Sequence, residues 1–213
     1  HRSPSGPGRW SSTRRRAGLY ADTPEGINFS QHANILAVLT HTAPIKKQQE
    51  IMRKVVGERG LTQCTLYFRF YLFRALKQAG LGDLYVGQLQ PWREALDYGL
   101  TTFPENPIGN TSVLGTRSDC HAWSAGPNYD LLATVCGIEP AAPGFASVRI
   151  EPSLGDLTWV RAAMPHPLGT ISVELERQKG RLIGKITLPE GLTGTYRFSG
   201  RPQKLHGGEN LIE

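Results

Sequence analysis

The stretch Gly137-Ile138-Glu139-Pro140-Ala141-Ala142-Pro143-Gly144 divides the sequence into two parts with different hydrophobic periods. Before it, apolar residues recur every three to four positions, as they do on the buried face of an α-helix. After it, apolar and polar residues alternate, as they do in strands that bury one face. We therefore predict an α-helical region that ends near Ile138 and an all-β domain that begins near Glu139.

The residues after Gly144 predict an antiparallel β-sandwich of about six strands. Apolar side chains alternate with polar ones at Val148, Ile150, Ile171, Val173, Leu175, Leu182, Ile186, Tyr196 and Phe198. Residues typical of turns separate these runs, at Gly155-Asp156, Gly169, Gly180, Pro189-Glu190-Gly191 and Gly200. Alternating runs with turns between them predict strands that pair antiparallel and bury one face each.

The residues before Gly137 predict about five helices, over 29–42, 45–56, 61–79, 81–100 and 118–137. We expect Ser30 to cap the first of them. The third is apolar on nearly every face, which predicts burial on all sides. Arg69 and Arg74 interrupt this helix. Each either reaches toward a site or links two helices, and the second interpretation is favoured.

The other helices are expected to bury one stripe each. For the second helix the predicted inner residues are Ile45, Ile51, Met52 and Val55. The fourth is either one helix or a pair broken at Pro91, and its predicted inner residues are Trp92, Leu96 and Leu100. Gly126-Pro127 should bend the fifth helix after its second turn.

The positive charge of the chain is concentrated in its first residues. The net charge is +6, of which five charges belong to Arg2, Arg9, Arg14, Arg15 and Arg16, leaving +1 for residues 17–213. Residues 1–16 are too poor in apolar side chains to offset the entropy of ordering them. A disordered basic leader is therefore favoured over a nucleic-acid-binding arm. We expect no nucleic-acid partner.

The composition favours a soluble chain without a metal or cofactor. No apolar run reaches the roughly 18 residues that span a bilayer, so no membrane partner is expected, and the compartment stays open. Cys64, Cys120 and Cys136 lack the spacing of a zinc site, and the histidines are scattered. Glycine patterns for phosphates or dinucleotides and a Gly-x-Ser-x-Gly nucleophile elbow are also missing from the sequence.

One further stretch has the character of a site. Thr101-Thr102-Phe103-Pro104-Glu105 places a carboxylate on a loop bounded by prolines, and Ser118–Ala125 places His121 and Trp123 on the first turns of the next predicted helix. A proline disfavours helix at the residue before it, so Glu105 should lie on a short fixed connection. Spacing alone also allows a simpler interpretation, in which Glu105 is a solvated loop acid and His121 is a capped helix residue.

Six motifs in order carry a resemblance to a known family. They are Phe29-Ser30-Gln31-His32-Ala33-Asn34, the run Leu96–Glu105, His121-Ala122-Trp123-Ser124-Ala125, Pro143-Gly144-Phe145, Leu154-Gly155-Asp156-Leu157-Thr158-Trp159 and Pro189-Glu190-Gly191. From roughly residue 17 onward, the sequence resembles the C-terminal segment of the α-L-rhamnosidases of glycoside hydrolase family 78. That resemblance implies a six-hairpin α/α barrel followed by a β-sandwich, and an inverting mechanism.

The resemblance also implies roles for particular residues. Glu105 matches the motif position of the general base, and His121 matches a histidine that contacts rhamnose. Trp123 lies beside it as a wall on which a sugar face can stack, and Trp92 is a further candidate for substrate binding. Inverting enzymes need a second carboxyl group as general acid. In the resembled family that acid lies upstream of the matching segment, and no family motif gives the role to Asp97 or Asp119.

A complete barrel of twelve helices needs on the order of 300 residues. The expected organisation is therefore multi-domain α and β: a leader over 1–16, a partial α/α-barrel catalytic domain over 17–138, and an antiparallel β-sandwich over 139–213. The unpartnered barrel edges predict a homo-oligomer. The function that the resemblance implies is that of a glycoside hydrolase of α-L-rhamnosidase type, which hydrolyses terminal glycosides with Glu105 as general base. The alternatives are a truncated carbohydrate-binding or interaction fragment, and a truncated glycosidase of relaxed specificity.

Overall fold

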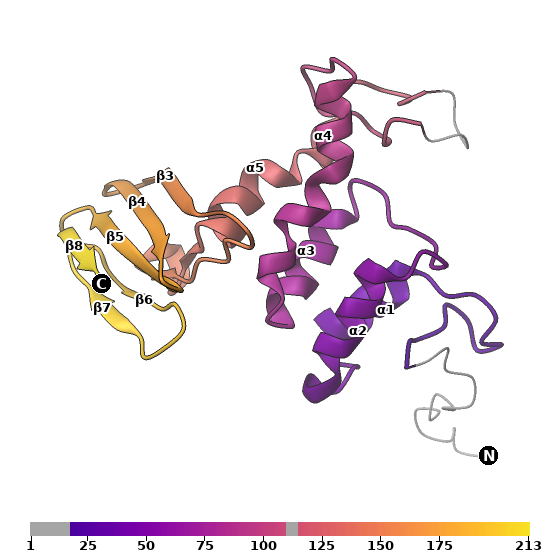
Figure 1. The fold of residues 1–213 in the computed structure, drawn as a ribbon, viewed down its shortest axis with the longest axis horizontal. Coiled ribbons are helices and arrows are strands. Elements are labelled where there is room, and N and C mark those ends of the chain that lie inside the picture. The colour runs from indigo at the N-terminus through magenta and orange to yellow at the C-terminus, as the bar shows by residue number, and fades with distance from the viewer. Residues whose placement is uncertain (1–17, 110–114) are drawn as a thin grey trace, which may run out of the picture. The chain divides into compact units, whose positions relative to one another are not determined.

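The computed structural model describes residues 18–109 and 115–213, and the chain forms two compact units that divide after Gly80 (Figure 1). The leader predicted over residues 1–16 lies outside the described residues. The described residues contain five α-helices and two β-sheets, which confirms the predicted fold class of helices followed by a sandwich. The change from helix to strand falls at Ile138, where the first strand begins.

The first unit contains three helices, α1 (Gln31–Leu39), α2 (Ile45–Gly57) and α3 (Arg69–Gln78). Ser30 caps α1 as predicted, because its hydroxyl oxygen accepts a hydrogen bond from the backbone N–H of Ala33 at 3.3 Å. The core of this unit consists of fully buried apolar side chains from all three helices. They are Ile35, Val38, Met52, Val55, Leu72 and Leu76.

Two expectations about this unit are wrong. The third helix begins only at Arg69 rather than near residue 61, and Tyr67 before it is 43% exposed, so the aromatic segment is not buried on all sides. Ile45 lies at the first position of α2 and is 79% exposed, because the buried face of that helix begins a turn later. The Arg74 guanidinium lies 5.7 Å from the centre of the Phe70 ring on the same helix.

The helical part of the second unit is built from short pieces. Two 3₁₀ turns, η1 (Gly82–Leu84) and η2 (Val86–Leu89), lead into α4 (Gln90–Asp97). After a long loop follow the 3₁₀ turn η3 (Ala122–Ser124), α5 (Gly126–Asp130) and a π-helical turn, η4 (Leu131–Val135). The region 81–100, predicted as one helix or a broken pair, is therefore divided into three pieces, and so is the single helix predicted over 118–137.

Two prolines explain part of this difference. Pro91 and Pro127 each occupy the first turn of a helix, where a missing N–H costs nothing. They begin α4 and α5, whereas we had expected them to break or bend longer helices. The buried side of α4 carries Trp92 and Ala95, and Leu96 is 70% exposed. The predicted stripe through Leu96 was therefore wrong in phase.

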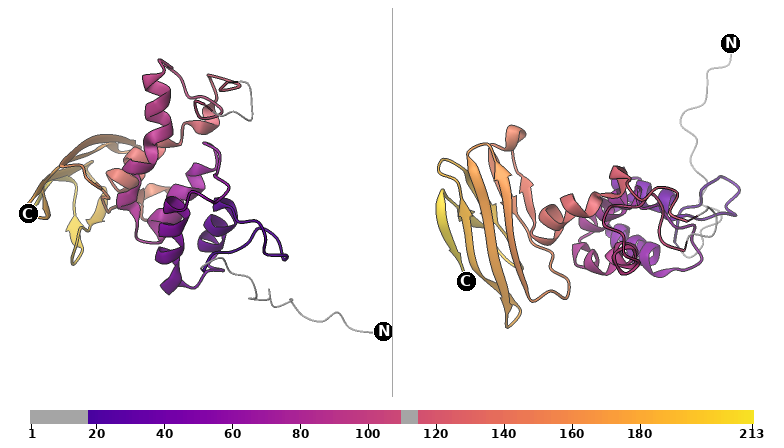
Figure 2. Two further views of the ribbon diagram at one scale, coloured as in Figure 1. Left: turned by 45° about the vertical axis from the view of Figure 1, so that its right-hand side comes forward. Right: turned by 90° about the horizontal axis from the view of Figure 1, so that it is seen from above.

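The sandwich has eight strands, β1 (Ile138–Pro140), β2 (Ser147–Ile150), β3 (Trp159–His166), β4 (Gly169–Gln178), β5 (Arg181–Leu188), β6 (Thr193–Tyr196), β7 (Gln203–Leu205) and β8 (Gly208–Ile212). One sheet has the order β1-β2-β6-β7 and the other β3-β4-β5-β8. All pairs are antiparallel except β2 with β6. Figure 2 shows the long strands β3, β4 and β5 side by side.

The inner faces of both sheets carry the alternating apolar residues that the sequence predicts. Ile171, Val173 and Leu175 on β4 are all buried, and so are Val148 and Ile150 on β2. A turn precedes β1 at Gly137, whose φ is +73° and whose Cα lies so close to Glu151 that an added Cβ would stand 2.1 Å from its carbonyl carbon. Only glycine meets both conditions, so this residue fixes how the last helical turn enters the sandwich.

Among the described residues, no helix has the length and apolar character required to cross a membrane.

Candidate functional site

Two segments, residues 103–106 and 116–121, pair through their backbones to form the site. The N–H of Glu105 donates to the carbonyl of Ser118 at 2.7 Å, and the N–H of His121 donates to the carbonyl of Phe103 at 2.7 Å. A third bond runs from the N–H of Asn106 to the carbonyl of Thr116 at 3.2 Å. These bonds hold Glu105 beside the segment 116–121, as strands of a ladder are held.

The Glu105 carboxylate is buried, and a cationic or ionisable group stands at each of its oxygens. Its side chain is 9% exposed. The Arg117 Nη1 atom lies 3.1 Å from Oε1, and the His121 Nδ1 atom lies 3.7 Å from Oε2. A buried carboxylate is stable only with such partners. The Arg117 side chain is itself 68% exposed, so one end of this cluster is open to solvent.

Sequence reasoning did not identify Arg117. Its φ of +64° lies in the left-handed region, which is uncommon for a residue with a side chain. In this conformation its guanidinium reaches Glu105, which lies earlier in the chain. A single arginine between Thr116 and Ser118 gives no motif from which this contact could be predicted. The signal is the backbone conformation, which only the structure supplies.

Ser124 and Trp92 hold this loop in position through hydrogen bonds. The Ser124 hydroxyl is fully buried and donates to the carbonyl of Pro104 at 2.6 Å, with the carbonyl of His121 2.9 Å away. The indole N–H of Trp92 donates to the carbonyl of Ser124 at 2.8 Å. Helix α4 is thereby tied through Ser124 to the residue before Glu105. Sequence reasoning had assigned Ser124 no role, and the structure gives it this one.

Trp123 presents an open aromatic surface at the site. Its ring centre lies 4.1 Å from that of His121 at an interplanar angle of 47°, and the residue is 48% exposed. Trp92 differs, because it is only 8% exposed and its N–H is already bonded. The structure therefore brings Glu105, His121 and Trp123 together, and it places Trp92 behind them as a positioning residue. His121 itself is extended, with φ of −132°, and precedes η3 instead of lying on a helical turn.

Asp119, the acid two residues before His121, takes part in holding the loop. The Thr116 hydroxyl donates to the Asp119 carboxylate, and the Thr102 hydroxyl donates to the Asp119 carbonyl. Within residues 18–109 and 115–213, no group of three or more His, Cys, Asp or Glu residues is placed to hold a metal ion. What the described residues can provide is one buried carboxylate, an imidazole, a guanidinium and an exposed indole around a common point.

In comparisons with known proteins, the sequence family and the solved structures described below are all α-L-rhamnosidases or parts of them. Residues 137–210 match the sequence family described as the bacterial alpha-L-rhamnosidase C-terminal domain. A comparison with curated proteins gives no match. The family 78 rhamnosidase of Bacillus sp. GL1 is similar in structure, with a TM-score of 0.72 and 28% sequence identity over 84% of this chain.

Two more distant structures share the fold. The α-L-rhamnosidase of Aspergillus terreus has a TM-score of 0.73 at 18% identity over 86% of this chain. That of Streptomyces avermitilis, solved with L-rhamnose, has a TM-score of 0.70 at 16% identity over 87% of this chain. The chain spans only 20%, 24% and 22% of the Bacillus, Aspergillus and Streptomyces chains, respectively.

Proposed function

We propose that this chain, whose fold and sequence match the C-terminal segment of the family 78 α-L-rhamnosidases, carries the general-base half of an inverting glycosidase site that acts on terminal rhamnosides. The observation that supports this most is the environment of Glu105. It is a buried carboxylate at the meeting point of two segments, with His121 and Arg117 on its two oxygens.

The chemistry assigned to Glu105 is proton removal from water. An inverting glycosidase holds a water molecule between the sugar and its basic carboxylate, and as the water attacks the anomeric carbon its proton passes to the carboxylate. Each Glu105 oxygen also faces a side chain. Arg117 is exposed and long, so it can leave Oε1 to make room for this water, whereas His121 remains fixed by its backbone bond to Phe103.

His121 and Trp123 are assigned to the sugar. The exposed indole of Trp123 offers a flat surface for the apolar face of a pyranose ring. The imidazole beside it can exchange hydrogen bonds with the sugar hydroxyls. The general acid is not assigned to any described residue. In this proposal it comes from the part of the barrel that corresponds to the rest of a family 78 enzyme, which agrees with the limited share of the relatives that this chain covers.

A second function is sugar binding without cleavage. The half-exposed Trp123, whose ring lies tilted against His121, favours it, because this pair alone can hold a sugar ring. A third possibility, hydrolysis of a broader range of glycosides, requires a replacement acid. These three functions predict different cleavage rates for an aryl α-L-rhamnoside and for other aryl glycosides, in the wild type and when Glu105 loses its charge.

The test is a panel of nitrophenyl glycosides with wild type, Glu105→Gln and the matched control Glu209→Gln. Glu209 is an exposed carboxylate on β8, paired with Lys185 far from the loop in sequence. Nitrophenolate leaves with little help from a general acid, so the proposal predicts slow cleavage of the nitrophenyl α-L-rhamnoside by this chain, reduced about 10²- to 10⁴-fold in Glu105→Gln and unchanged in the control. Equal rates in wild type and Glu105→Gln would refute it. Binding of L-rhamnose with no cleavage of any glycoside would support the second function instead.

A further inference from the structure

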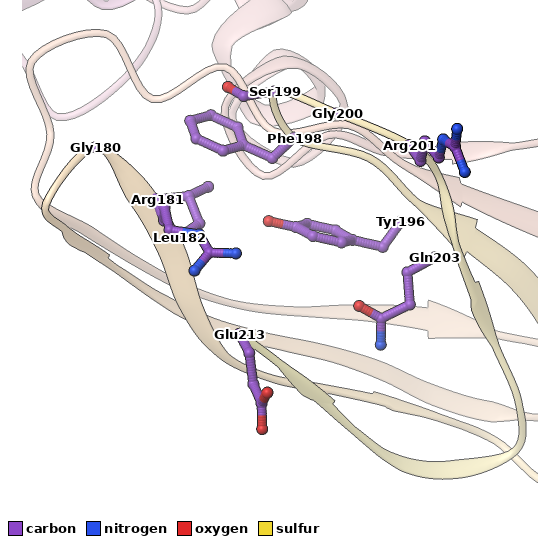
Figure 3. A pocket seen from close by; sticks show the side chains of 10 residues that line it. All are labelled: Gly180, Arg181, Leu182, Tyr196, Phe198, Ser199, Gly200, Arg201, Gln203 and Glu213. Atoms are coloured by element: carbon purple, nitrogen blue, oxygen red, sulfur yellow. The ribbon is translucent and has the colours of Figure 1, made fainter.

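One end of the sandwich contains a cavity of about 230 Å³. Its lining residues are distant in the sequence from the loop that carries Glu105, residues 101–109 and 115–121, which we call the Glu105 loop. Both sheets contribute to its walls. The start of β5 supplies Arg181 and Leu182, and the end of β6 supplies Tyr196. The turn from β6 to β7 supplies Phe198 and its neighbours. Figure 3 shows these side chains gathered around one space.

The hydroxyl of Tyr196 is the feature that marks this cavity as a binding site. The residue is 7% exposed, and its ring extends into the space with the hydroxyl directed toward the β5 side (Figure 3). Among the residues that the structure describes, this hydroxyl has no hydrogen-bond partner. Burial raises the pKa of Tyr196 to about 12, so the hydroxyl keeps its proton and remains a donor. The fully buried polar atoms that lack a partner among the described residues do not include this oxygen, so it is open to the cavity, where an acceptor on a ligand can replace solvent.

The cavity wall also offers two aromatic rings and a guanidinium group to a ligand. Phe198 lies across from Tyr196 in Figure 3, and the Arg177 guanidinium stands 5.7 Å from the Phe198 ring centre, which steadies that ring. Arg181 has no ion pair within the described residues, so its guanidinium is available to acceptors. The Gln203 amide is held by a 3.0 Å bond to the carbonyl of Leu211.

We propose that this cavity binds one neutral sugar ring. A pyranose has an apolar face for Phe198 and Tyr196, and its hydroxyls both donate and accept, as the wall requires. The volume is below the roughly 300 to 1,000 Å³ of sites for drug-sized ligands, which fits one ring rather than a chain of them. The charged lining residues are two arginines, Arg181 and Arg201, and one carboxylate, Glu213. Because both signs are present, a neutral ring whose hydroxyls donate and accept suits the lining, and the D-glucuronate titration below tests whether the second arginine selects an acid instead.

The site is independent of Glu105, so its failure and that of the proposed function can be told apart. The experiment is a titration of the ¹⁵N-labelled chain with methyl β-D-glucopyranoside, methyl α-L-rhamnopyranoside and D-glucuronate, followed by amide shifts of Tyr196, Ser199 and Gly200. We expect millimolar binding of at least one neutral glycoside at these amides. Tyr196→Phe, which keeps the ring, should weaken it about tenfold.

Control variants separate the cavity from other sites. Glu105→Gln should leave the shifts at the cavity unchanged. Trp159→Ala removes an exposed aromatic residue from the outer face of β3 and should also leave them unchanged. The proposal is overturned if neither neutral glycoside shifts these amides, if Tyr196→Phe binds as tightly as wild type, or if D-glucuronate binds more tightly than both neutral glycosides.

Discussion

The Glu105 loop and the sandwich hold their side chains in place by different means. In the sandwich, each strand is fixed by a ladder of backbone bonds and by buried apolar residues that alternate along it. In the loop, the catalytic candidates depend on three backbone bonds, the hydroxyl of Ser124 and the ion pair of Arg117. The stability of the fold therefore lies mainly in the sandwich and the helices, and the geometry of the site depends on a few polar contacts.

The largest effect on stability should come from the sandwich core. Ile186→Ala on β5 removes a fully buried side chain and should lower the free energy of unfolding by about 2 to 5 kcal/mol. Chemical denaturation measures this loss. Trp159→Ala, on the exposed face of the same sheet, is the control and should change stability by less than about 0.5 kcal/mol. Similar losses in both variants would contradict the claim that the buried core of the sandwich is a main source of stability.

A smaller loss is expected where a single buried hydroxyl fixes the loop. Ser124→Ala leaves the carbonyl of Pro104 without its donor and should cost about 1 to 3 kcal/mol. It should also disturb the position of Glu105, which the amide shifts of Phe103, Glu105 and Asn106 would report. Ser199→Ala, an exposed hydroxyl in the β6–β7 turn, serves as the control. A loss in Ser124→Ala no greater than in this control would mean that the hydroxyl does not hold the loop.

The ion pair of Arg117 should contribute little to stability and more to the site. Because the guanidinium is mostly exposed, Arg117→Ala should change the free energy of unfolding by less than about 1 kcal/mol. In the proposed mechanism the same change alters turnover of an aryl α-L-rhamnoside, since one oxygen of Glu105 loses its partner. Thermal melts and initial rates measured on one preparation decide this. A large drop in melting temperature with an unchanged rate would make Arg117 a structural residue.

The reactivity of the three cysteine thiols should distinguish the buried parts of the folded protein from the exposed loop. Burial raises the pKa of the Cys64 and Cys136 thiols to about 11, whereas Cys120 in the loop is exposed. The thiolate is the reactive form, so near pH 8 a disulfide reagent should modify Cys120 and leave the other two intact in the folded protein. The Cys120→Ser variant should then give almost no fast reaction. Rapid modification of all three thiols would show that the cores open readily.

The sandwich was predictable because its pattern is local. Alternation along β4 and turn residues at its ends are sufficient to identify a strand that buries Ile171, Val173 and Leu175. The parallel pairing of β2 with β6 was not predictable, because it joins segments that are far apart in the sequence. The helices predicted over 81–100 and 118–137 were made too long, since Pro91 and Pro127 allow two interpretations, a kink or a first turn.

Those site residues that belong to a recognisable sequence motif were predictable. Glu105, His121 and Trp123 do lie together, although their catalytic and binding roles stay predictions. Trp92 was chosen for its type, but its burial depends on the phase of α4, which sequence spacing left open. Arg117 depends on a backbone angle that no residue pattern specified. The homo-oligomer and the lack of nucleic-acid and membrane partners also stay predictions.

The most direct test of the proposed role of Glu105 is the configuration of the sugar that is released first. A general base that activates water yields inversion, whereas a carboxylate that attacks the sugar itself yields retention. Proton NMR of early time points, during cleavage of an aryl α-L-rhamnoside, distinguishes the two before the free sugar equilibrates. The account predicts that β-L-rhamnose forms first, at a rate that falls sharply in Glu105→Gln. Formation of α-L-rhamnose first would contradict it.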